Sequence, residues 1–313
     1  MDDSLAIETR RLTRRYGKLI AVEDLNLKVP HGALFGLIGP NGAGKTTTLR
    51  MLAGLLEPSS GEIVIGGQVA NHDWRELRRH IGYMPDFFGV YEDMLVWEYL
   101  DFFARCYDVP SAQSKQMIDE LIELVDLTDK RDAYIQTLSR GMRQRLCLAH
   151  ALVHDPQVLL LDEPASGLDP RARVEMRELL RELGAMGKTI LLSSHILTEL
   201  AELCDSVGII EKGHLVASGP VAEISRHLRD ERILRIKVLS KADEATSILR
   251  DQPGVGQVNE VNGFLEFEFT GNEEAAANIL DRLVGSGIRV SSFSEIASDL
   301  EDIFLKLTKG EVA

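Results

Sequence analysis

The sequence predicts an α/β protein in which helices cover a parallel sheet, followed by a small α+β domain. Three observations lead to this fold class. Short apolar runs alternate with helical patterns through the first two thirds of the 313 residues, which is the order typical of parallel sheets. From about residue 87 to about residue 151 the strand signals vanish and apolar residues recur at helical spacing. After about residue 229 the predicted order becomes β-α-β-β-α-β, the ferredoxin-like pattern.

The composition is that of an ordinary globular chain of about two domains. With 44% hydrophobic and 27% charged residues, a disordered or collagen-like chain is excluded. Three widely spaced cysteines without a C-x-x-C motif predict reduced residues in a cytosolic protein. The net charge of −14 argues against broad duplex binding, so no nucleic-acid partner is expected. No apolar run reaches the roughly 20 residues of a membrane-spanning helix.

The elements of the first domain follow from their hydrophobic patterns. Leu5–Leu12 and Ile20–Val29 alternate apolar and polar residues and predict a small antiparallel β subdomain. Four near-continuous apolar runs predict strands that are buried on both faces of a parallel sheet, namely Ala33–Ile38, Val158–Leu161, Ile190–Leu192 and Val207–Ile210. The inserted block is predicted to contain helices over Asp93–Cys106, Ser114–Val125 and Ser139–Val153.

The C-terminal segment reads as a separate acidic module. Its predicted strands are Ile233–Leu239, Val255–Val261, Phe264–Phe269 and Ile288–Phe293, with a turn at Asn262-Gly263 between the middle two. Its predicted helices are Ala242–Arg250, Glu273–Val284 and Leu300–Thr308. The predicted domains are therefore residues 1–228, with a helical subdomain at about 87–151, and residues 229–313. No chemistry is visible in the second domain, and its role is left open between a dimer contact and regulation.

The strongest chemical signal is the run Gly39-Pro40-Asn41-Gly42-Ala43-Gly44-Lys45-Thr46. It matches G-x-x-x-x-G-K-[ST], follows an apolar strand and precedes a helical pattern that begins at Thr46. Small residues let successive backbone N–H groups converge on phosphate oxygens, and a helix N-terminus favours their negative charge. Lys45 supplies a positive charge for the β- and γ-phosphates, and Thr46 a hydroxyl for Mg²⁺. The run, with the adjoining Thr47, predicts a nucleotide-binding P-loop.

Two carboxylates follow the apolar run Val158–Leu161. They are Asp162 and Glu163, and their position predicts the C-terminal edge of the sheet, where ligands of open α/β sheets bind. Asp162 would hold Mg²⁺, and Glu163 would orient or deprotonate the attacking water. Behind a P-loop, this interpretation is favoured over an ordinary helix start. The two motifs predict a nucleotide hydrolase.

A third motif indicates which kind of hydrolase. The run Leu138-Ser139-Arg140-Gly141-Met142-Arg143-Gln144-Arg145 opens a predicted helix and resembles the signature sequence of the ATP-binding cassette (ABC) family, usually Leu-Ser-Gly-Gly-Gln. The resemblance extends from about Leu5 to Arg229, with the other family motifs in order and at the family's spacing. They are Tyr16 at the adenine-stacking position, Met84-Pro85-Asp86 at the Q-loop, Ser166-Gly167-Leu168-Asp169 at the D-loop and Ser193-Ser194-His195 at the switch histidine. The chain is thus identified as a member of the ABC ATPases.

This resemblance implies a fold and a reaction. The implied fold is a P-loop NTPase with a RecA-like parallel core, an antiparallel β subdomain and an inserted helical subdomain. The implied reaction is ATP hydrolysis with Mg²⁺. The implied catalytic residues are Lys45, Glu163 and His195, and the implied metal ligands are Thr46, Asp162 and Asp86.

The resemblance also implies that the site is completed by a second subunit. Ser139, as the N-cap of a helix, would offer its hydroxyl while the Gly141 amide points outward. In ABC proteins this second anion site closes on the γ-phosphate bound by the partner, so that two subunits enclose two ATP molecules. A homodimer is expected, or a heterodimer with another ABC subunit.

The sequence departs from the family pattern at two places. The Q-loop glutamine is replaced by Asp86, which offers a charged and shorter side chain, so metal binding is expected to persist with altered geometry. In the signature, Arg140 replaces a glycine and Met142 a glutamine, while Ser139 and Gly141 are kept. An active site is therefore still expected.

As a function, the resemblance implies the motor subunit of an ABC transporter, of the exporter type with separate six-helix permease chains. This places the protein at the cytoplasmic face of the membrane, held there by the permease. The aromatic-rich stretch from Phe87 to Phe103 is either the core of the helical block or a partner groove. The alternatives are a soluble ABC ATPase acting on a ribosome or nucleic acid and, outside the ABC family, a P-loop GTPase or kinase, which the absence of an N-K-x-D motif disfavours.

Overall fold

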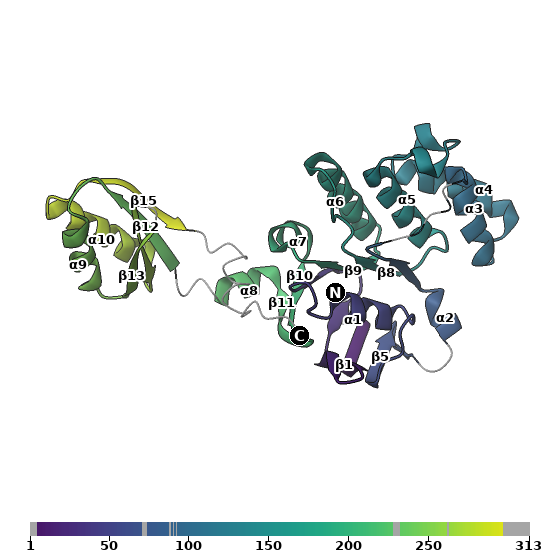
Figure 1. Ribbon diagram of the computed structural model, residues 1–313, viewed down its shortest axis with the longest axis horizontal. Helices are drawn as coiled ribbons and strands as arrows, with labels where there is room; N and C mark the ends of the chain where they lie inside the picture. The colour runs from purple at the N-terminus through teal and green to yellow at the C-terminus, as the bar shows by residue number, and fades with distance from the viewer. Residues whose placement is uncertain are drawn as a thin grey trace. The chain divides into compact units, whose positions relative to one another are not determined.

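The computed structural model describes residues 5–70, 74–87, 89, 91, 93–227, 232–261 and 263–296. These residues divide into two compact units, one up to Val221 and one from Ala222 (Figure 1). The predicted boundary between residues 228 and 229 falls in a stretch outside the described residues. Each unit is described by itself.

The first sheet of the larger unit is antiparallel and centres on β1 (Leu5–Tyr16). Its other strands are β2 (Leu19–Leu25), β3 (Lys28–Pro30), β5 (Ser60–Ile65) and β6 (Gln68–Val69). The predicted strand over Ile20–Val29 is divided into β2 and β3. The reason is that Asp24 adopts a left-handed conformation (φ +48°) and Asn26 Oδ1 accepts a hydrogen bond from the Arg11 amide between the two strands.

The second sheet has the strand order β11-β10-β4-β9-β8-β7 and is parallel except for the pairing of β11 with β10. The strands are β4 (Leu34–Ile38), β7 (Ile81–Met84), β8 (Val158–Asp162), β9 (Thr189–Ser194), β10 (Ser206–Glu211) and β11 (His214–Pro220). Every residue of β4, β8 and β9 is buried, as the apolar runs predicted. The four predicted parallel strands are confirmed.

One core fills the space between the two sheets. It includes Ile7 of β1, Leu37 of β4, Leu160 of β8 and Leu49 of α1 (Lys45–Leu52). Figure 1 shows α1 between the antiparallel and the parallel sheet. Because α1 is packed from both sides, the loop that precedes it is held at the carboxyl end of β4.

At the carboxyl edge of the parallel sheet, two strands are followed by helices. α6 (Pro170–Ala185) follows β8 and α7 (Leu197–Leu203) follows β9. Asp169 caps α6 because its Oδ1 accepts hydrogen bonds from the amides of Arg171 and Ala172, both at 3.0 Å. The remaining helix of this region is α2 (Trp74–Arg78), while α8 (Val221–His227) follows β11 and begins at the last described residue of the larger unit.

The inserted block contains α3 (Val96–Cys106), α4 (Ser111–Leu124) and α5 (Arg140–Leu152), which confirms the three predicted helices. α4 begins three residues earlier than predicted, directly after Pro110, and the buried Ser114 hydroxyl donates to Asp101 Oδ1 of α3 at 2.9 Å. Short 3-10 turns at Thr128–Lys130 and Ile135–Thr137 connect α4 to α5.

The smaller unit forms a four-stranded antiparallel sheet in the order β13-β14-β12-β15. Its elements are β12 (Arg232–Val238), α9 (Ala242–Arg250), β13 (Val255–Val261), β14 (Phe264–Phe269), α10 (Glu273–Gly285) and β15 (Val290–Ile296). The predicted ferredoxin-like order is confirmed over these elements. The predicted helix Leu300–Thr308 and the turn residue Asn262 lie outside the described residues.

Candidate nucleotide site

The P-loop joins β4 to α1 and needs glycine where the chain passes close to other backbone. Gly44 has φ +110°, and a Cβ there would lie 2.5 Å from the carbonyl oxygen of Ala21. A Cβ on Gly39 would lie 2.3 Å from the carbonyl oxygen of Ile210. Real Cβ atoms do not approach oxygen this closely, so both positions require glycine. The glycine spacing of the motif is therefore also a packing requirement of the fold.

A cleft at the carboxyl edge of the parallel sheet brings most of the predicted site residues together. Five segments contribute to it: β2, the P-loop, the loops after β7 and β8, and the residue that follows β9. The lining residues are Ala21, Asn41, Gly42, Ala43, Gly44, Lys45, Thr46, Thr47, Asp86, Glu163, Ser166 and His195. This is the edge at which open α/β sheets bind ligands.

Lys45 is the buried cation of this cleft. Only 6% of its side chain is exposed, and Nζ donates to the carbonyl oxygens of Gly39 at 2.7 Å and Pro40 at 3.3 Å. Nζ also lies 3.5 Å from Glu163 Oε1. Burial lowers the pKa of Lys45, while the Glu163 carboxylate opposes this shift. Gly39 and Pro40 thus position Lys45 through their carbonyl groups, and the structure does not place them among the residues that line the cleft.

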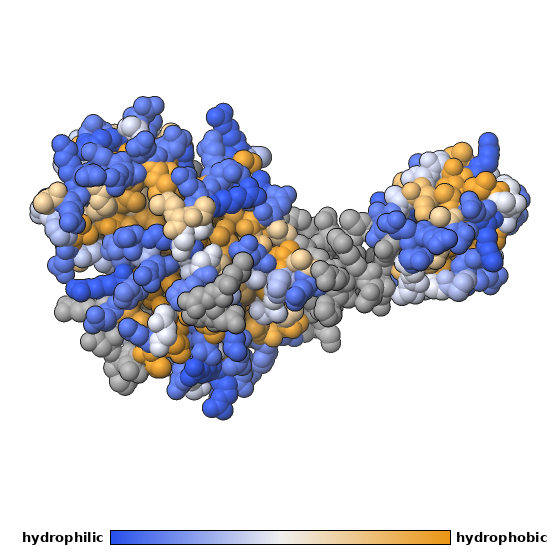
Figure 2. Space-filling view, turned by 180° about the vertical axis from the view of Figure 1, so that it is seen from behind, coloured by the Kyte–Doolittle hydropathy of each residue, from blue (hydrophilic) through white to orange (hydrophobic). Residues whose placement is uncertain are grey.

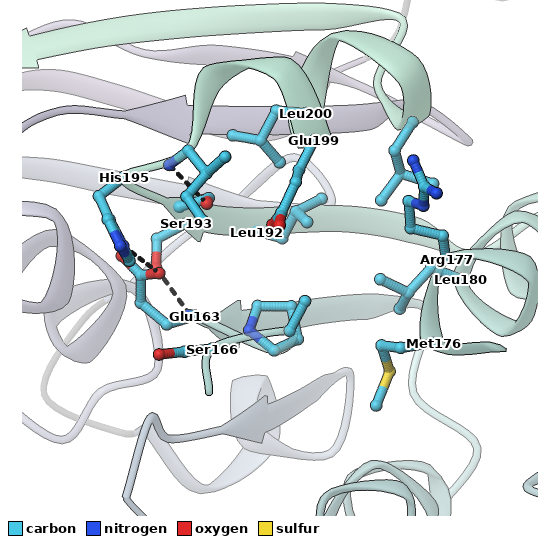
Figure 3. Close-up of a pocket in the computed structure, with 15 residues that line it drawn as sticks. Glu163, Ser166, Met176, Arg177, Leu180, Leu192, Ser193, His195, Glu199 and Leu200 are labelled. Carbon is cyan, nitrogen blue, oxygen red and sulfur yellow. Dashed lines mark hydrogen bonds and ion pairs between the residues drawn. The ribbon is translucent and has the colours of Figure 1, made fainter. Parts of the chain in front are cut away.

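The Glu163 carboxylate lies between two partners, one at each of its oxygens. Its Oε1 faces Lys45, and a hydrogen bond of 2.9 Å joins its Oε2 to Nδ1 of His195 (Figure 3). Its backbone has φ +52°, a conformation that costs a non-glycine residue of order 1–3 kcal/mol. The Glu163 amide donates to Ser193 Oγ at 3.0 Å, which helps to hold this conformation. The carboxylate is thereby directed into the cleft by its own backbone.

Asp162 is buried directly behind Glu163, with 1% of its surface exposed. Ser193 Oγ donates to its Oδ1 at 2.7 Å, whereas its Oδ2 has no hydrogen-bond partner within the described part of the chain. A buried carboxylate oxygen without a partner is costly unless a cation or water satisfies it. Carboxylate and hydroxyl oxygens are the ligands that Mg²⁺ prefers. Asp162, with Thr46 and Asp86 of the cleft, therefore fits a Mg²⁺ site. Over the same described residues, no group of three or more His, Cys, Asp or Glu side chains could hold a metal ion by itself.

The signature residues lie in a different hollow. Ser139 caps α5, and its Oγ accepts a hydrogen bond from the Met142 amide at 3.3 Å. Ser139 and Gly141 line this hollow together with Gly167, Leu168 and Asp169, and none of these residues lines the P-loop cleft. The signature hollow and the P-loop cleft therefore share no lining residue.

Tyr16 also lies outside the lining of the P-loop cleft. It ends β1, is 45% exposed, and the Arg14 guanidinium stacks 4.6 Å from its ring centroid. Its exposed aromatic ring remains available to an adenine base.

Two residues of the site were not singled out by the sequence analysis. Ser193 bonds both Asp162 and Glu163, and Gln144 of α5 lies 3.5 Å from the Glu163 carbonyl oxygen through Nε2. Both lie inside motifs that were recognised. Their contacts join segments that are 19 to 31 residues apart, so no local pattern could reveal them.

The P-loop, the acidic pair after β8, the helical insertion and the capped signature helix define a P-loop ATPase of the ATP-binding cassette type. Comparisons with known proteins agree. Residues 22–166 match the family described as ABC transporter, and residues 219–308 match the domain described as ATP-binding protein DrrA1-3-like, C-terminal domain.

Relatives that match nearly the whole chain include an export protein and a resistance protein. Nod factor export ATP-binding protein I of Burkholderia orbicola (strain AU 1054) is 38% identical over 308 residues, which are 98% of each chain. Linearmycin resistance ATP-binding protein LnrL of Bacillus subtilis (strain 168) is 30% identical over 304 residues, or 96% of this chain and 98% of that one. A solved ATP binding subunit of an ABC transporter is 32% identical with a TM-score of 0.65, covering 72% of this chain and 94% of the other.

The chain belongs to the ATP-binding proteins of ABC transporters. It binds ATP, is an ATPase, and is the motor subunit of an exporter-type transporter. No helix among the described residues has the length and apolar character to cross a bilayer.

Proposed function

We propose that residues 1–228 form the nucleotide-binding domain, with a helical subdomain at about 87–151, and that the P-loop cleft is its hydrolytic site. The observation that carries this proposal is the convergence of the P-loop, Asp86, Glu163 and His195 on one cleft from four separate segments. In this cleft Asn41–Thr47 hold the phosphates through backbone amides, with the support of the α1 N-terminus. Tyr16 stacks on the adenine, and Gly39 and Pro40 position Lys45.

Three side chains carry out the reaction. Lys45 stabilises the charge of the β- and γ-phosphates. Glu163 orients the attacking water and accepts its proton, because its carboxylate reaches the cleft between Lys45 and His195. His195, 43% exposed at the end of β9, contacts the γ-phosphate and fixes the direction of the Glu163 carboxylate. The residues that would hold Mg²⁺ are Thr46, Asp162 and Asp86, and the ion would neutralise phosphate charge when bound.

The signature hollow is proposed to serve the nucleotide of a second subunit. Ser139 and Gly141 present a hydroxyl and an amide at the N-terminus of α5, away from the chain's own cleft. Two chains, or one chain and a second ABC subunit, would then enclose two ATP molecules.

A second groove is the proposed contact with the permease. It is lined by Arg50 of α1, Leu55 after α1, Tyr83 of β7, Phe103 of α3, Tyr107 directly after α3, and His150 of α5. The aromatic stretch is only partly core, since Tyr99 is buried while Phe87 is 90% and Phe102 42% exposed. Hydrophobic patches bordered by hydrophilic residues are visible on the larger unit in Figure 2. Such a surface suits an apolar partner helix, and the permease would hold the protein at the cytoplasmic face of the membrane.

The Glu163→Gln variant tests the hydrolytic site and the dimer together. It keeps the hydrogen-bonding shape but removes the base, so kcat should fall by about 100-fold or more, while ATP with Mg²⁺ should produce a stable dimer in size-exclusion chromatography. The matched control is Glu163→Gln with Lys45→Ala, which should stay monomeric because ATP binding is weakened. Full turnover by Glu163→Gln would overturn the assignment of the base.

The permease contact is tested with a photo-crosslinking residue placed at Leu55, which lines the groove and is 59% exposed, in native cells. A multi-helix membrane protein should be captured there and not from Val284 of α10, which is also exposed (56%) but lies in the smaller unit. Capture of ribosomal proteins or nucleic acid in its place would favour the soluble alternative.

A further inference from the structure

The signature helix α5 touches the turn that follows β8 at two points. Arg140 Nη2 donates to the carbonyl oxygen of Ser166 at 3.1 Å. Gln144 Nε2, one helical turn later and buried, lies 3.5 Å from the carbonyl oxygen of Glu163. Residues four apart lie on the same face of a helix, so one face of α5 faces both ends of this turn.

The turn between these two points is short and carries the proposed base. The Ser166 amide donates to the Glu163 carbonyl at 3.0 Å, closing residues 163–166 into a single turn. Glu163 has the left-handed φ of +52° within it. The hydrogen bond that closes the turn joins Ser166 to Glu163. A displacement of Ser166 therefore changes the backbone conformation of Glu163 and the direction of its carboxylate.

Arg140 is fitted closely to its position. A Cβ added to Gly167, which has φ +65°, would lie 2.3 Å from the Arg140 guanidinium carbon. The guanidinium therefore lies flat against the glycine backbone. The next signature residue is also constrained, since a Cβ on Gly141 would lie 3.3 Å from the Ala172 side chain. The arginine that departs from the usual signature thus has a specific structural partner within its own chain.

We propose that Arg140 is a positioning residue that couples the signature hollow to the base in the same chain. The proposal rests on the proposed function, in which Ser139 and Gly141 contact the partner's ATP and Glu163 activates water. When the start of α5 contacts a phosphate, the hydrogen bond from Arg140 keeps the Ser166 carbonyl group at a fixed position relative to α5. Gln144 lies close to the Glu163 carbonyl group. Occupancy of one site is thereby transmitted to the base of the other.

The test compares Arg140→Ala with Arg140→Lys and Arg140→Gly in the full chain. Arg140→Ala should lower kcat about tenfold, since small misplacements of catalytic groups have effects of this size or larger. KM and the ATP affinity of the chain should stay within about twofold, because the P-loop is untouched. Arg140→Lys, which keeps one donor, should recover part of kcat. Hydrogen exchange at the peptide containing residues 163–166 should speed up in Arg140→Ala.

Arg181→Ala is the matched control. It removes an arginine from the neighbouring helix α6, where its guanidinium pairs with Glu178 at 2.6 Å and lines neither the P-loop cleft nor the signature hollow. Its kcat and its exchange at residues 163–166 should match those of the unaltered chain. Gly167→Ala is a second variant that displaces the guanidinium without changing charge. Its loss of kcat should be smaller when Arg140 is already alanine, since the two changes disrupt one contact, while the backbone strain of alanine at φ +65° is the same in both backgrounds.

Unchanged kcat and unchanged exchange in Arg140→Ala would overturn the proposal. A rise in KM together with loss of the ATP-dependent dimer would also overturn it, because Arg140 would then be a phosphate ligand. Failure of the proposed function is distinguishable: it would show as full turnover by Glu163→Gln, whatever the Arg140 variants do.

Discussion

Asp86 is the residue at which this site departs most from the usual chemistry of its family. It lines the cleft with Thr46 and Glu163, and Asp162 is buried behind them. Three carboxylates against the single lysine Lys45 give this part of the site an excess of negative charge, which a divalent cation would balance. The charged side chain of Asp86 should therefore attract Mg²⁺ more strongly than a neutral amide would.

The variant Asp86→Gln should raise the Mg²⁺ concentration needed for half-maximal ATPase activity by about threefold or more, because one ligand charge is lost. Binding of Mn²⁺ in the presence of ATP, measured by electron paramagnetic resonance, gives a readout that does not depend on turnover. Asp86→Ala serves as the comparison and should weaken binding further. Equal Mg²⁺ and Mn²⁺ dependence in all three proteins would show that Asp86 does not face the metal.

For single residues, the sequence predicts well which residues belong to the site, but it predicts their contacts poorly. Asp162 and Glu163 could be found because they follow an apolar strand. The left-handed backbone of Glu163 and the two hydrogen bonds of Ser193 could not, because they depend on how β8 and β9 align. Tyr16 illustrates the same limit, since its place in a motif does not say what its ring contacts.

Among the elements, the packing of α3 against α5 should make the stability of the larger unit depend on pH. His150 of α5 stacks on Phe103 with ring centroids 3.8 Å apart, and its Nδ1 lies 3.4 Å from the Tyr99 hydroxyl. Burial, and secondarily the charge of His154, lower the pKa of His150 from 6.5 to about 4. The unfolded chain therefore binds more protons than the folded chain between these values. Stability should fall as the pH decreases through this window.

Between pH 7 and pH 5 this single histidine should account for about 2 kcal/mol of the loss in unfolding free energy. The variant His150→Phe should lose correspondingly less over the same interval, while the exposed His31→Asn should behave like the unaltered chain. Tryptophan fluorescence during urea unfolding is a suitable probe, because both tryptophans, Trp74 and Trp97, belong to the larger unit. An identical pH dependence in all three proteins would contradict the shift.

The elements also show where hydrophobic patterns suffice. Strands buried on both faces were found from continuous apolar runs, but β7 was missed because it has four residues and contains Gly82. That glycine is needed because a Cβ there would lie 2.2 Å from the Ala151 carbonyl oxygen of α5. This close approach between β7 and a helix of the inserted block is a feature of the tertiary structure, so the hydrophobic pattern of the strand does not indicate it.

For the whole molecule, the main feature is that, among the described residues, the hydrophobic core of the larger unit and that of the smaller unit share no residue. One core includes Leu37, Leu49 and Leu160 of the larger unit, and the other includes Leu234, Phe267 and Ile279 of the smaller unit. The full chain should therefore unfold in two calorimetric transitions.

ATP with Mg²⁺ at about 100 times its dissociation constant adds roughly 2.7 kcal/mol to the free energy of unfolding of the unit that binds it. For a unit of this size, this corresponds to a rise of about 5–10 °C in the transition temperature. Only the transition of the larger unit should shift, and Lys45→Ala should abolish the shift without moving the second transition. A single transition, or a shift of both by ATP, would mean that the two units are thermodynamically coupled and that the smaller unit senses the nucleotide.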